Sequence, residues 1–133
     1  MGFAKARFEI VGTRERIQGT ALVDTGAWYT ALDRGLAERL GVELTGLTVV
    51  LTTFPGQRMK CEEGLVRALT LEGRTAPSEL VAVCVIPEPV RELLRRQGVS
   101  DQVVIGVHTL ERLGYAVDVI THRLVESPGI LMI

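Results

Sequence analysis

An apolar, strand-like run that ends in an acidic residue, a hydroxyl and a glycine constrains this chain most. The run Ile17–Val23 leads directly into Asp24-Thr25-Gly26-Ala27. A carboxylate at the end of a buried strand is costly unless it is paired or hydrogen-bonded. Gly26 lets the backbone turn sharply and lets another backbone, or a substrate, approach closely. The pattern therefore marks a candidate functional site, with an ordinary Asp-Gly turn as the alternative.

Length and composition indicate one domain, residues 1–133, with an aliphatic core. Hydrophobic residues make up 47% of the chain and aromatic residues only 5%, so the core must consist of Val, Leu, Ile and Ala. Fifteen basic and sixteen acidic residues leave a formal charge of −1, which gives no electrostatic case for a nucleic-acid partner.

The sequence carries no signal for a membrane or for secretion. No apolar run reaches the roughly 18 residues of a membrane-spanning helix, and no apolar stretch follows the charged N-terminus. Ala6 speaks against myristoylation of Gly2. We therefore expect a cytoplasmic protein without a membrane partner.

The cysteines and histidines do not form a recognisable ligand set. Cys61 and Cys84 are far apart in the sequence and not in a Cys-x-x-Cys arrangement, which favours two buried or half-buried strand residues over a disulfide, with pairing left open. His108 and His122 are expected at the surface. Because two cysteines and two histidines without metal-ligand spacing do not suggest zinc, we expect neither a metal nor a cofactor.

Hydrophobic patterning and turn signals predict mostly strands, interrupted by two or three short helices. Strands are expected at Arg7–Val11, Ile17–Val23, Leu47–Thr53, Arg58–Cys61, Leu65–Leu71, Glu79–Ile86, Gln102–Gly106, Tyr115–Ile120 and Arg123–Glu126. Helices are expected between the N-cap Asp33 and Gly41, from Pro87 to about Gln97, and over Thr109–Leu113. The pattern predicts a mainly all-β fold, either a small closed barrel or a sandwich.

Four local features carry further expectations. Gly19 inside a strand suggests a bend or bulge, and Phe54-Pro55-Gly56-Gln57 predicts an exposed hairpin tip. Arg91, Arg95 and Arg96 are expected to form a solvated helix face. The apolar tail Ile130–Ile133 either pairs with a partner strand or joins the core.

Two segments resemble the retropepsin-like aspartic proteases, in particular their single-domain prokaryotic members. Ala21–Ala27, followed by Thr30 and Leu32, resembles the active-site loop of that family. Val104-Ile105-Gly106 and the residues after it, Leu110-Glu111, Leu113-Gly114, Val117-Asp118 and Arg123-Leu124, resemble its hydrophobic-Gly segment. The resemblance spans about residues 6–129 and implies a closed β-barrel of the acid protease type, active as a homodimer.

The resemblance also assigns roles to residues. It implies that Asp24 is catalytic and that Thr25, Gly26 and Ala27 complete the active-site loop. It further implies substrate contacts in the flap and cleft, from Pro55, Gly56, Gln57, Ile105 and Gly106.

The chain departs from the viral members of that family in three places. Trp28-Tyr29 replaces acidic residues, and Val107-His108 replaces a polar Arg-Asp/Asn pair. Residues 87–101 look like an insertion, which either covers the cleft or packs outside it.

The sequence contains a single Asp-Thr-Gly, since Asp33, Asp101 and Asp118 are not followed by Thr/Ser-Gly. Hydrolysis by two facing carboxylates therefore requires a second copy of the chain, which supplies the other Asp24. We expect a metal-free aspartic endopeptidase that acts on a peptide or an unfolded protein. The alternatives are a catalytically inactive dimeric β module that binds peptides or proteins, and a monomeric β protein in which Asp24 only forms a turn.

Overall fold

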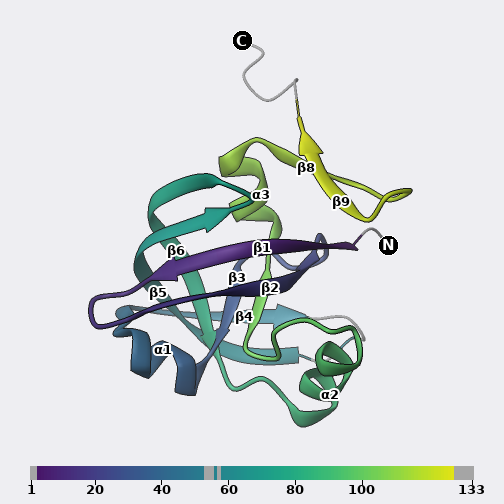
Figure 1. The fold of residues 1–133 in the computed structure, drawn as a ribbon. Coiled ribbons are helices and arrows are strands. Elements are labelled where there is room, and N and C mark those ends of the chain that lie inside the picture. Colours follow the sequence, from purple (N-terminus) through teal and green to yellow (C-terminus); the bar gives the residue numbers. More distant parts are fainter. Residues whose placement is uncertain (1–2, 53–55, 57, 128–133) are drawn as a thin grey trace.

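A computed structural model describes residues 3–52, 56 and 58–127, and this part of the chain forms nine strands and three short helices (Figure 1). In chain order these elements are β1 (Phe3–Val11), β2 (Arg16–Asp24), β3 (Thr30–Asp33), α1 (Arg34–Leu40), β4 (Glu43–Thr52), β5 (Arg58–Leu71), β6 (Arg74–Cys84), α2 (Glu88–Arg96), β7 (Val103–Ile105), α3 (Val107–Leu113), β8 (Tyr115–Asp118) and β9 (Arg123–Glu126). None of the three helices is long and apolar enough to cross a lipid bilayer.

Six strands close into a barrel. Their order is β1-β2-β7-β3-β6-β5, and β5 pairs back with β1, from Phe8 opposite Leu71 to Val11 opposite Ala68. The barrel is mixed, because β2 runs parallel to β7 and β3 runs parallel to β6, while the other pairs are antiparallel. β4 lies outside this ring and extends the sheet by pairing with β5. The predicted closed, mainly β fold with short helices is confirmed.

The alternation of side chains along the strands divides the core in two. Val23, Leu32 and Ile105 point into the barrel and belong to an inner apolar cluster. Their neighbours point outward and form an outer cluster that includes Leu22, Ala31, Cys84 and Val104. Val90 and Leu94 of α2 cover this outer cluster, so the segment 87–101 packs on the outside of the barrel.

Three strand predictions need correction. β5 is one continuous strand of 14 residues where two strands were predicted, because Glu62 and Glu63 also pair with β6 and so continue the ladder. Thr30–Asp33 forms the strand β3, which the sequence analysis did not predict. Gly19 causes no bulge, since the pairing of β1 with β2 is regular throughout; a Cβ atom there would lie 3.3 Å from the ring of Phe8.

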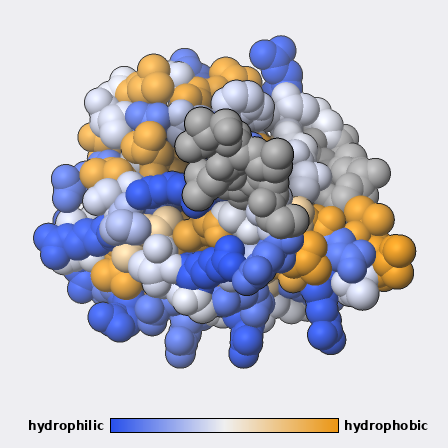
Figure 2. Space-filling view, turned by 90° about the horizontal axis from the view of Figure 1, so that it is seen from above, coloured by the Kyte–Doolittle hydropathy of each residue, from blue (hydrophilic) through white to orange (hydrophobic). Residues whose placement is uncertain are grey.

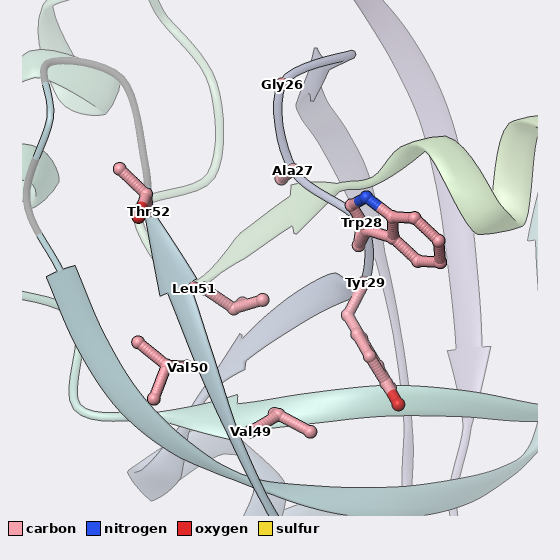
Figure 3. Close-up of a pocket in the computed structure, with 8 residues that line it drawn as sticks. All are labelled: Gly26, Ala27, Trp28, Tyr29, Val49, Val50, Leu51 and Thr52. Atoms are coloured by element: carbon pink, nitrogen blue, oxygen red, sulfur yellow. The ribbon is translucent and has the colours of Figure 1, made fainter.

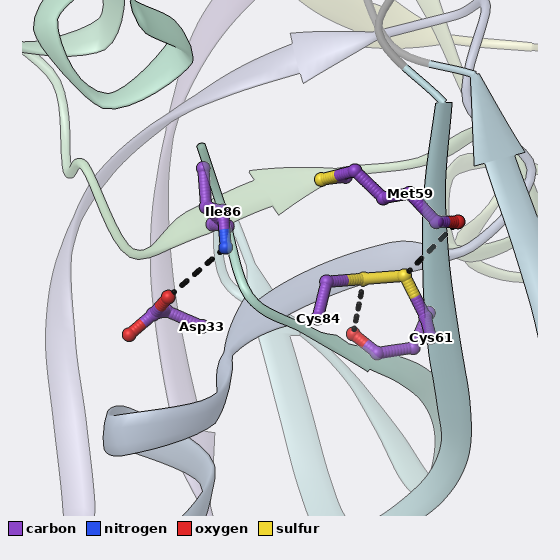
Figure 4. Close-up of a disulfide and its surroundings, with 6 residues drawn as sticks. Asp33, Met59, Cys61, Cys84 and Ile86 are labelled. Carbon is purple, nitrogen blue, oxygen red and sulfur yellow. Dashed lines mark hydrogen bonds between the residues drawn. A yellow bond between two sulfur atoms is a disulfide. The ribbon is translucent and has the colours of Figure 1, made fainter. Parts of the chain in front are cut away.

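The two cysteines form a disulfide, which the sequence analysis had placed second to two unpaired thiols (Figure 4). Cys61 on β5 lies opposite Cys84 on β6, with 4.6 Å between the Cα atoms, because the register of this antiparallel pair brings them together. Both are buried in the outer cluster, as predicted. Sequence separation gave no hint of the pairing, because strand register sets it.

Arg95 and Arg96 of α2 are exposed, as predicted for a solvated helix face, whereas Arg91 is half-buried, and all three form ion pairs. Arg91 lies 3.2 Å from Asp101 and 3.8 Å from Asp33, and Arg95 lies 2.8 Å from Asp101. Burial of Asp101 acts to raise its pKa, but the hydrogen bonds from Arg95 and Arg91 outweigh burial and hold the pKa below its ordinary value. Arg96 pairs with Glu92 one helical turn away.

A hairpin of β8 and β9 sits beside the barrel at the top of Figure 1. Arg74 of β6 holds it there: its guanidinium bonds the Leu113 carbonyl and Glu126 and lies 4.7 Å from the ring centroid of Tyr115. The hairpin exposes Val119, Ile120 and Val125. The view from this side shows several separate orange hydrophobic patches among blue hydrophilic side chains (Figure 2). The tail Ile130–Ile133 lies outside the described residues.

Candidate active site

Asp24 stands at the end of β2, where the barrel strands give way to a loop. β2 runs parallel to β7, with Val23 opposite Ile105, so the two strands end side by side. The Asp24 side chain is buried, with 4% of the residue exposed, and its Oδ1 accepts the Gly26 N–H at 2.9 Å. The Ala27 N–H also bonds the Asp24 carbonyl at 3.1 Å. The turn thus fixes a nearly buried carboxylate at one end of the barrel.

The loop residues predicted from the resemblance lie in different environments. Thr25 and Gly26 are exposed, whereas Ala27 is buried. Gly26 has no left-handed backbone angle. A Cβ atom at this position would lie 3.2 Å from Asp24 Oδ1, a tight contact that the carboxylate could relieve only by shifting. The sharp turn predicted at this position is present, closed by the bond from the Ala27 N–H to the Asp24 carbonyl, but it does not require a left-handed glycine.

Gly106 and the first residues of α3 contact the second half of this loop, from Ala27 to Tyr29. The Val107 N–H bonds the Ala27 carbonyl at 2.8 Å, and the His108 N–H bonds the Trp28 carbonyl at 2.9 Å. A Cβ atom on Gly106 would lie 2.2 Å from the Tyr29 carbonyl oxygen, so only glycine allows this approach. The two segments that carried the resemblance are therefore in direct contact.

Ile105 and Gly106 were predicted to contact substrate. In a single chain Ile105 is fully buried in the inner cluster, and Gly106 is buried against the loop. In the predicted flap, Gly56 has a left-handed backbone with a φ of 96°, as the turn prediction requires. Pro55 and Gln57 lie outside the described residues.

A pocket of about 470 Å³ opens between the loop and β4 (Figure 3). One wall is formed by the loop and the other by β4, with the lining residues Gly26, Ala27, Trp28, Tyr29, Val49, Val50, Leu51 and Thr52. Leu51 points toward the loop in Figure 3. Because β4 leads into the predicted flap, the pocket has the position of a cleft between flap and loop.

Trp28 and Tyr29 shape the loop side of this pocket. The ring of Trp28, which is 65% exposed, lies 4.9 Å from that of the exposed His108. The Tyr29 hydroxyl donates a 2.6 Å hydrogen bond to Glu63, which also accepts from Thr45. These hydrogen bonds, from Tyr29 and then Thr45, lower the pKa of Glu63, and the bond to Glu63 raises the pKa of Tyr29.

A buried polar network behind the loop was missed by the sequence analysis. The Thr30 and Thr109 hydroxyls, both fully buried, lie 2.7 Å apart, and Thr109 donates to Glu79 at 2.7 Å. Glu79 pairs with Arg112 at 2.7 Å. Isolated Thr and Glu residues in strand and helix patterns gave no signal, because the network forms only when β3, β6 and α3 meet.

The other aspartates serve the fold. Asp33 caps α1, as predicted, by accepting the Gly35 N–H at 3.3 Å. Asp118 accepts the Ile120 N–H at 2.9 Å in the hairpin turn, which lowers its pKa. Within residues 3–52, 56 and 58–127, no basic side chain forms an ion pair with Asp24.

Comparison with known proteins agrees with this geometry. The fold is similar to the crystal structure of a retropepsin-like aspartic protease from Rickettsia conorii, with a TM-score of 0.51 and 18% sequence identity over 88% of this chain and 85% of that chain. No curated protein matches the chain. A family model described as "Aspartyl protease" matches residues 7–109, which is more than half of the chain and includes Asp24, Gly106 and the flap region. The chain therefore belongs to the aspartyl protease family.

Proposed function

We propose that this chain is a homodimeric aspartic endopeptidase in which the Asp24 residues of two copies form the catalytic pair. The observation that carries the proposal is the position of Asp24: nearly buried, fixed by the Gly26 N–H, and without a basic partner among the described residues. Such a carboxylate is costly by itself. A second carboxylate that shares one proton with it removes one of the two charges.

The chemistry follows from the shared proton. One carboxylate takes a proton from a water molecule, whose oxygen attacks the carbonyl carbon of the scissile peptide, while the protonated partner donates to the carbonyl oxygen. A proton then passes to the amide nitrogen, the C–N bond breaks, and a carboxylic acid and an amine leave. Two carboxylates that share a proton in this way are the established arrangement in aspartic proteases as a class.

A dimer with a two-fold axis would bring the two loops together, because such an interface joins the same surface on both copies. Thr25 is exposed next to Asp24, and in this proposal it bonds across the axis. The hairpin residues Val119, Ile120 and Val125 are 60%, 85% and 43% exposed, and they supply apolar surface that a second copy can cover.

The proposed substrate is a peptide or an unfolded protein chain. The pocket between the loop and β4 is walled by Ala27, Val49 and Leu51, so it offers space for a substrate side chain. In this proposal the hairpin around Gly56 closes over the peptide and excludes water. The cytoplasmic location stays a prediction; the disulfide Cys61–Cys84 is a feature more common in oxidising compartments.

Cleavage by the wild type and by Asp24→Asn tests the catalytic role. An unfolded, fluorescently labelled casein serves as the probe, and the substitution should lower kcat/KM about 10³-fold or more. Asp33→Asn is the matched control, since Asp33 is also a buried aspartate at a strand end. Equal cleavage by wild type and Asp24→Asn would refute the proposal.

Sedimentation equilibrium tests the dimer. Wild type and Asp24→Asn should both sediment as dimers at micromolar concentration, and activity should fall on dilution as the dimers separate. Proteolysis by a chain that stays monomeric would contradict a shared site. The rate should also fall at high pH, where the pair loses its shared proton.

A further inference from the structure

Glu79, Thr109, Thr30 and Gly106 form a buried series of hydrogen bonds. Which group donates and which accepts in each bond follows from the chemistry of the groups. Glu79 pairs with Arg112 at 2.7 Å, so its carboxylate accepts and does not donate. Thr109 therefore gives its only hydroxyl proton to Glu79. Because that proton is used, Thr30 must be the donor in the 2.7 Å contact between the two hydroxyls.

The chain of hydrogen bonds ends at the active-site loop. Thr30 Oγ1 donates to Thr109 and accepts the Gly106 N–H at 3.1 Å. Gly106 begins the segment that bonds the Ala27 and Trp28 carbonyls through Val107 and His108. A continuous series of hydrogen bonds thus connects the Glu79 carboxylate to the backbone segment that bonds the loop after Asp24.

The surroundings make this network rigid. Thr30 and Thr109 are fully buried, and Glu79 is 5% exposed. Thr109 and Arg112 are three residues apart on α3, which places them on the same face of the helix. Arg112 also donates to the carbonyls of Pro77 and Ser78, the two residues that precede Glu79, so it is fixed to β6 by backbone contacts as well as by the ion pair. Buried, satisfied networks of charged groups hold one geometry.

We propose that Glu79 is a positioning residue for the Asp24 loop. Its carboxylate, fixed by Arg112, sets the direction of the Thr109–Thr30–Gly106 chain and thereby the placement of the backbone on which the loop rests. The inference rests on the proposed proteolytic function, because positioning shows in the rate only if Asp24 does the chemistry. Small displacements of reacting groups reduce rates strongly, whereas substrate binding in a pocket changes less.

Glu79→Gln breaks the network while it keeps the shape of the side chain. If the amide NH₂ faces Thr109, the hydrogen bonds reverse and the Thr30 proton has no acceptor in the chain. If it faces Arg112, two donors meet. We expect kcat to fall about 10-fold to 100-fold with little change in KM. The matched control is Glu111→Gln, which removes the same charge from an exposed residue on α3 and should leave both constants unchanged.

A second pair of variants keeps the test decisive if Glu79→Gln folds poorly. Thr109→Val removes the hydroxyl and keeps the volume, so it should lower kcat as Glu79→Gln does; Thr109→Ser restores the hydroxyl and should recover most of the rate. Assays are run where sedimentation shows dimers. The proposal is overturned if kcat of Glu79→Gln stays within about twofold of Glu111→Gln, or if Thr109→Val and Thr109→Ser are equally active.

Amide hydrogen exchange separates this inference from the proposed function. In Glu79→Gln the amides of Gly106, Val107 and His108 should exchange about 10-fold faster than in Glu111→Gln, because their hydrogen bonds lose support. This readout does not depend on catalysis. If the wild type cleaves nothing, the proposed function fails, while unchanged exchange at these three amides would overturn the positioning role itself.

Discussion

Asp24 and Asp33 begin two Asp-x-Gly turns with the same local design. Asp24 ends β2 and Asp33 ends β3, and both side chains are almost buried. Each carboxylate accepts the N–H of the glycine that follows, Gly26 at 2.9 Å and Gly35 at 3.3 Å. After Asp33 the chain continues as α1, whereas after Asp24 it forms the loop that lines the pocket.

The surroundings of the two carboxylates differ. Asp33 also accepts the Ile86 N–H at 3.2 Å, lies 3.8 Å from Arg91 and faces the start of a helix (Figure 4). Asp24 has no such ion pair in the part of the chain that the structure describes. Positive charge and N–H donors thus satisfy Asp33 within one chain. The two turns share the Asp-x-Gly motif and differ in the positive charge near the carboxylate, and this difference is why we propose a catalytic role for Asp24 and a structural one for Asp33.

Asp33→Ala should give the largest loss of stability. It removes the helix cap, the acceptor of the buried Ile86 N–H and the partner of Arg91, and the free energy of unfolding should fall by about 3 kcal/mol. Urea unfolding measures the loss. The Ile86 and Gly35 N–H groups bond different oxygens of Asp33, so Asp33→Asn, with a single acceptor oxygen, keeps only one of the two bonds and should lose less stability than Asp33→Ala. An equal loss would show that the one remaining acceptor contributes nothing. Asp24→Asn should change the unfolding free energy little.

Reduction of the disulfide Cys61–Cys84 tests how much it stabilises the part of the outer cluster that lies next to Asp33. Cys84 lies opposite Asp33 in the pairing of β6 with β3, so the disulfide and the cap stabilise one region. Closing a loop over a sequence separation of 23 residues should stabilise the fold, by about 3 kcal/mol. Urea unfolding with and without dithiothreitol measures this. The reduced chain, while folded, should retain its kcat. A loss of activity in parallel with stability would show that the Asp33 region and the Asp24 loop do not behave independently.

The sequence was informative where the structure is local. The N-cap at Asp33, the helix stop at Gly41 and the loop motif at Asp24 depend on neighbours in the chain, and the first two are confirmed. The resemblance of two separate segments predicted the barrel. The Cys61–Cys84 pairing and the Glu79–Thr109 contact depend on strand register and on how α3 packs, which no local pattern encodes.

The glycines of the two turns provide a smaller, matched test. In Gly35→Ala the Cβ atom would lie 3.5 Å from Asp33 Oδ2, an ordinary contact, so the helix should gain up to about 0.5 kcal/mol. In Gly26→Ala the distance to Asp24 Oδ1 would be 3.2 Å, and the carboxylate must shift. We expect about a 10-fold loss in kcat/KM for Gly26→Ala and none for Gly35→Ala, measured by peptide cleavage. Equal activities would mean that the Asp24 turn tolerates displacement as well as the Asp33 turn does.

Tyr29→Phe, in the loop that follows Asp24, should have the smallest effect, a change in the pKa of Glu63 and in stability at low pH. The Tyr29 hydrogen bond, followed by that of Thr45, holds the pKa of Glu63 below its ordinary value of 4.5. A pKa lowered in the folded state contributes stability above the ordinary value, which is lost as the pH falls through the lowered one. Without the hydroxyl, the pKa of Glu63 should move upward and the loss of stability in acid should become less steep.

An NMR titration of the Glu63 carboxyl carbon measures this shift. Tyr115→Phe is the control, because the Tyr115 hydroxyl donates to a backbone carbonyl, that of Glu72, and should leave Glu63 unchanged. A Glu63 pKa that does not rise in Tyr29→Phe would show that Thr45 alone holds the carboxylate. The Tyr29 hydroxyl would then contribute little on the loop side, whereas Asp33 is held by its bonds from Gly35 and Ile86 and by Arg91.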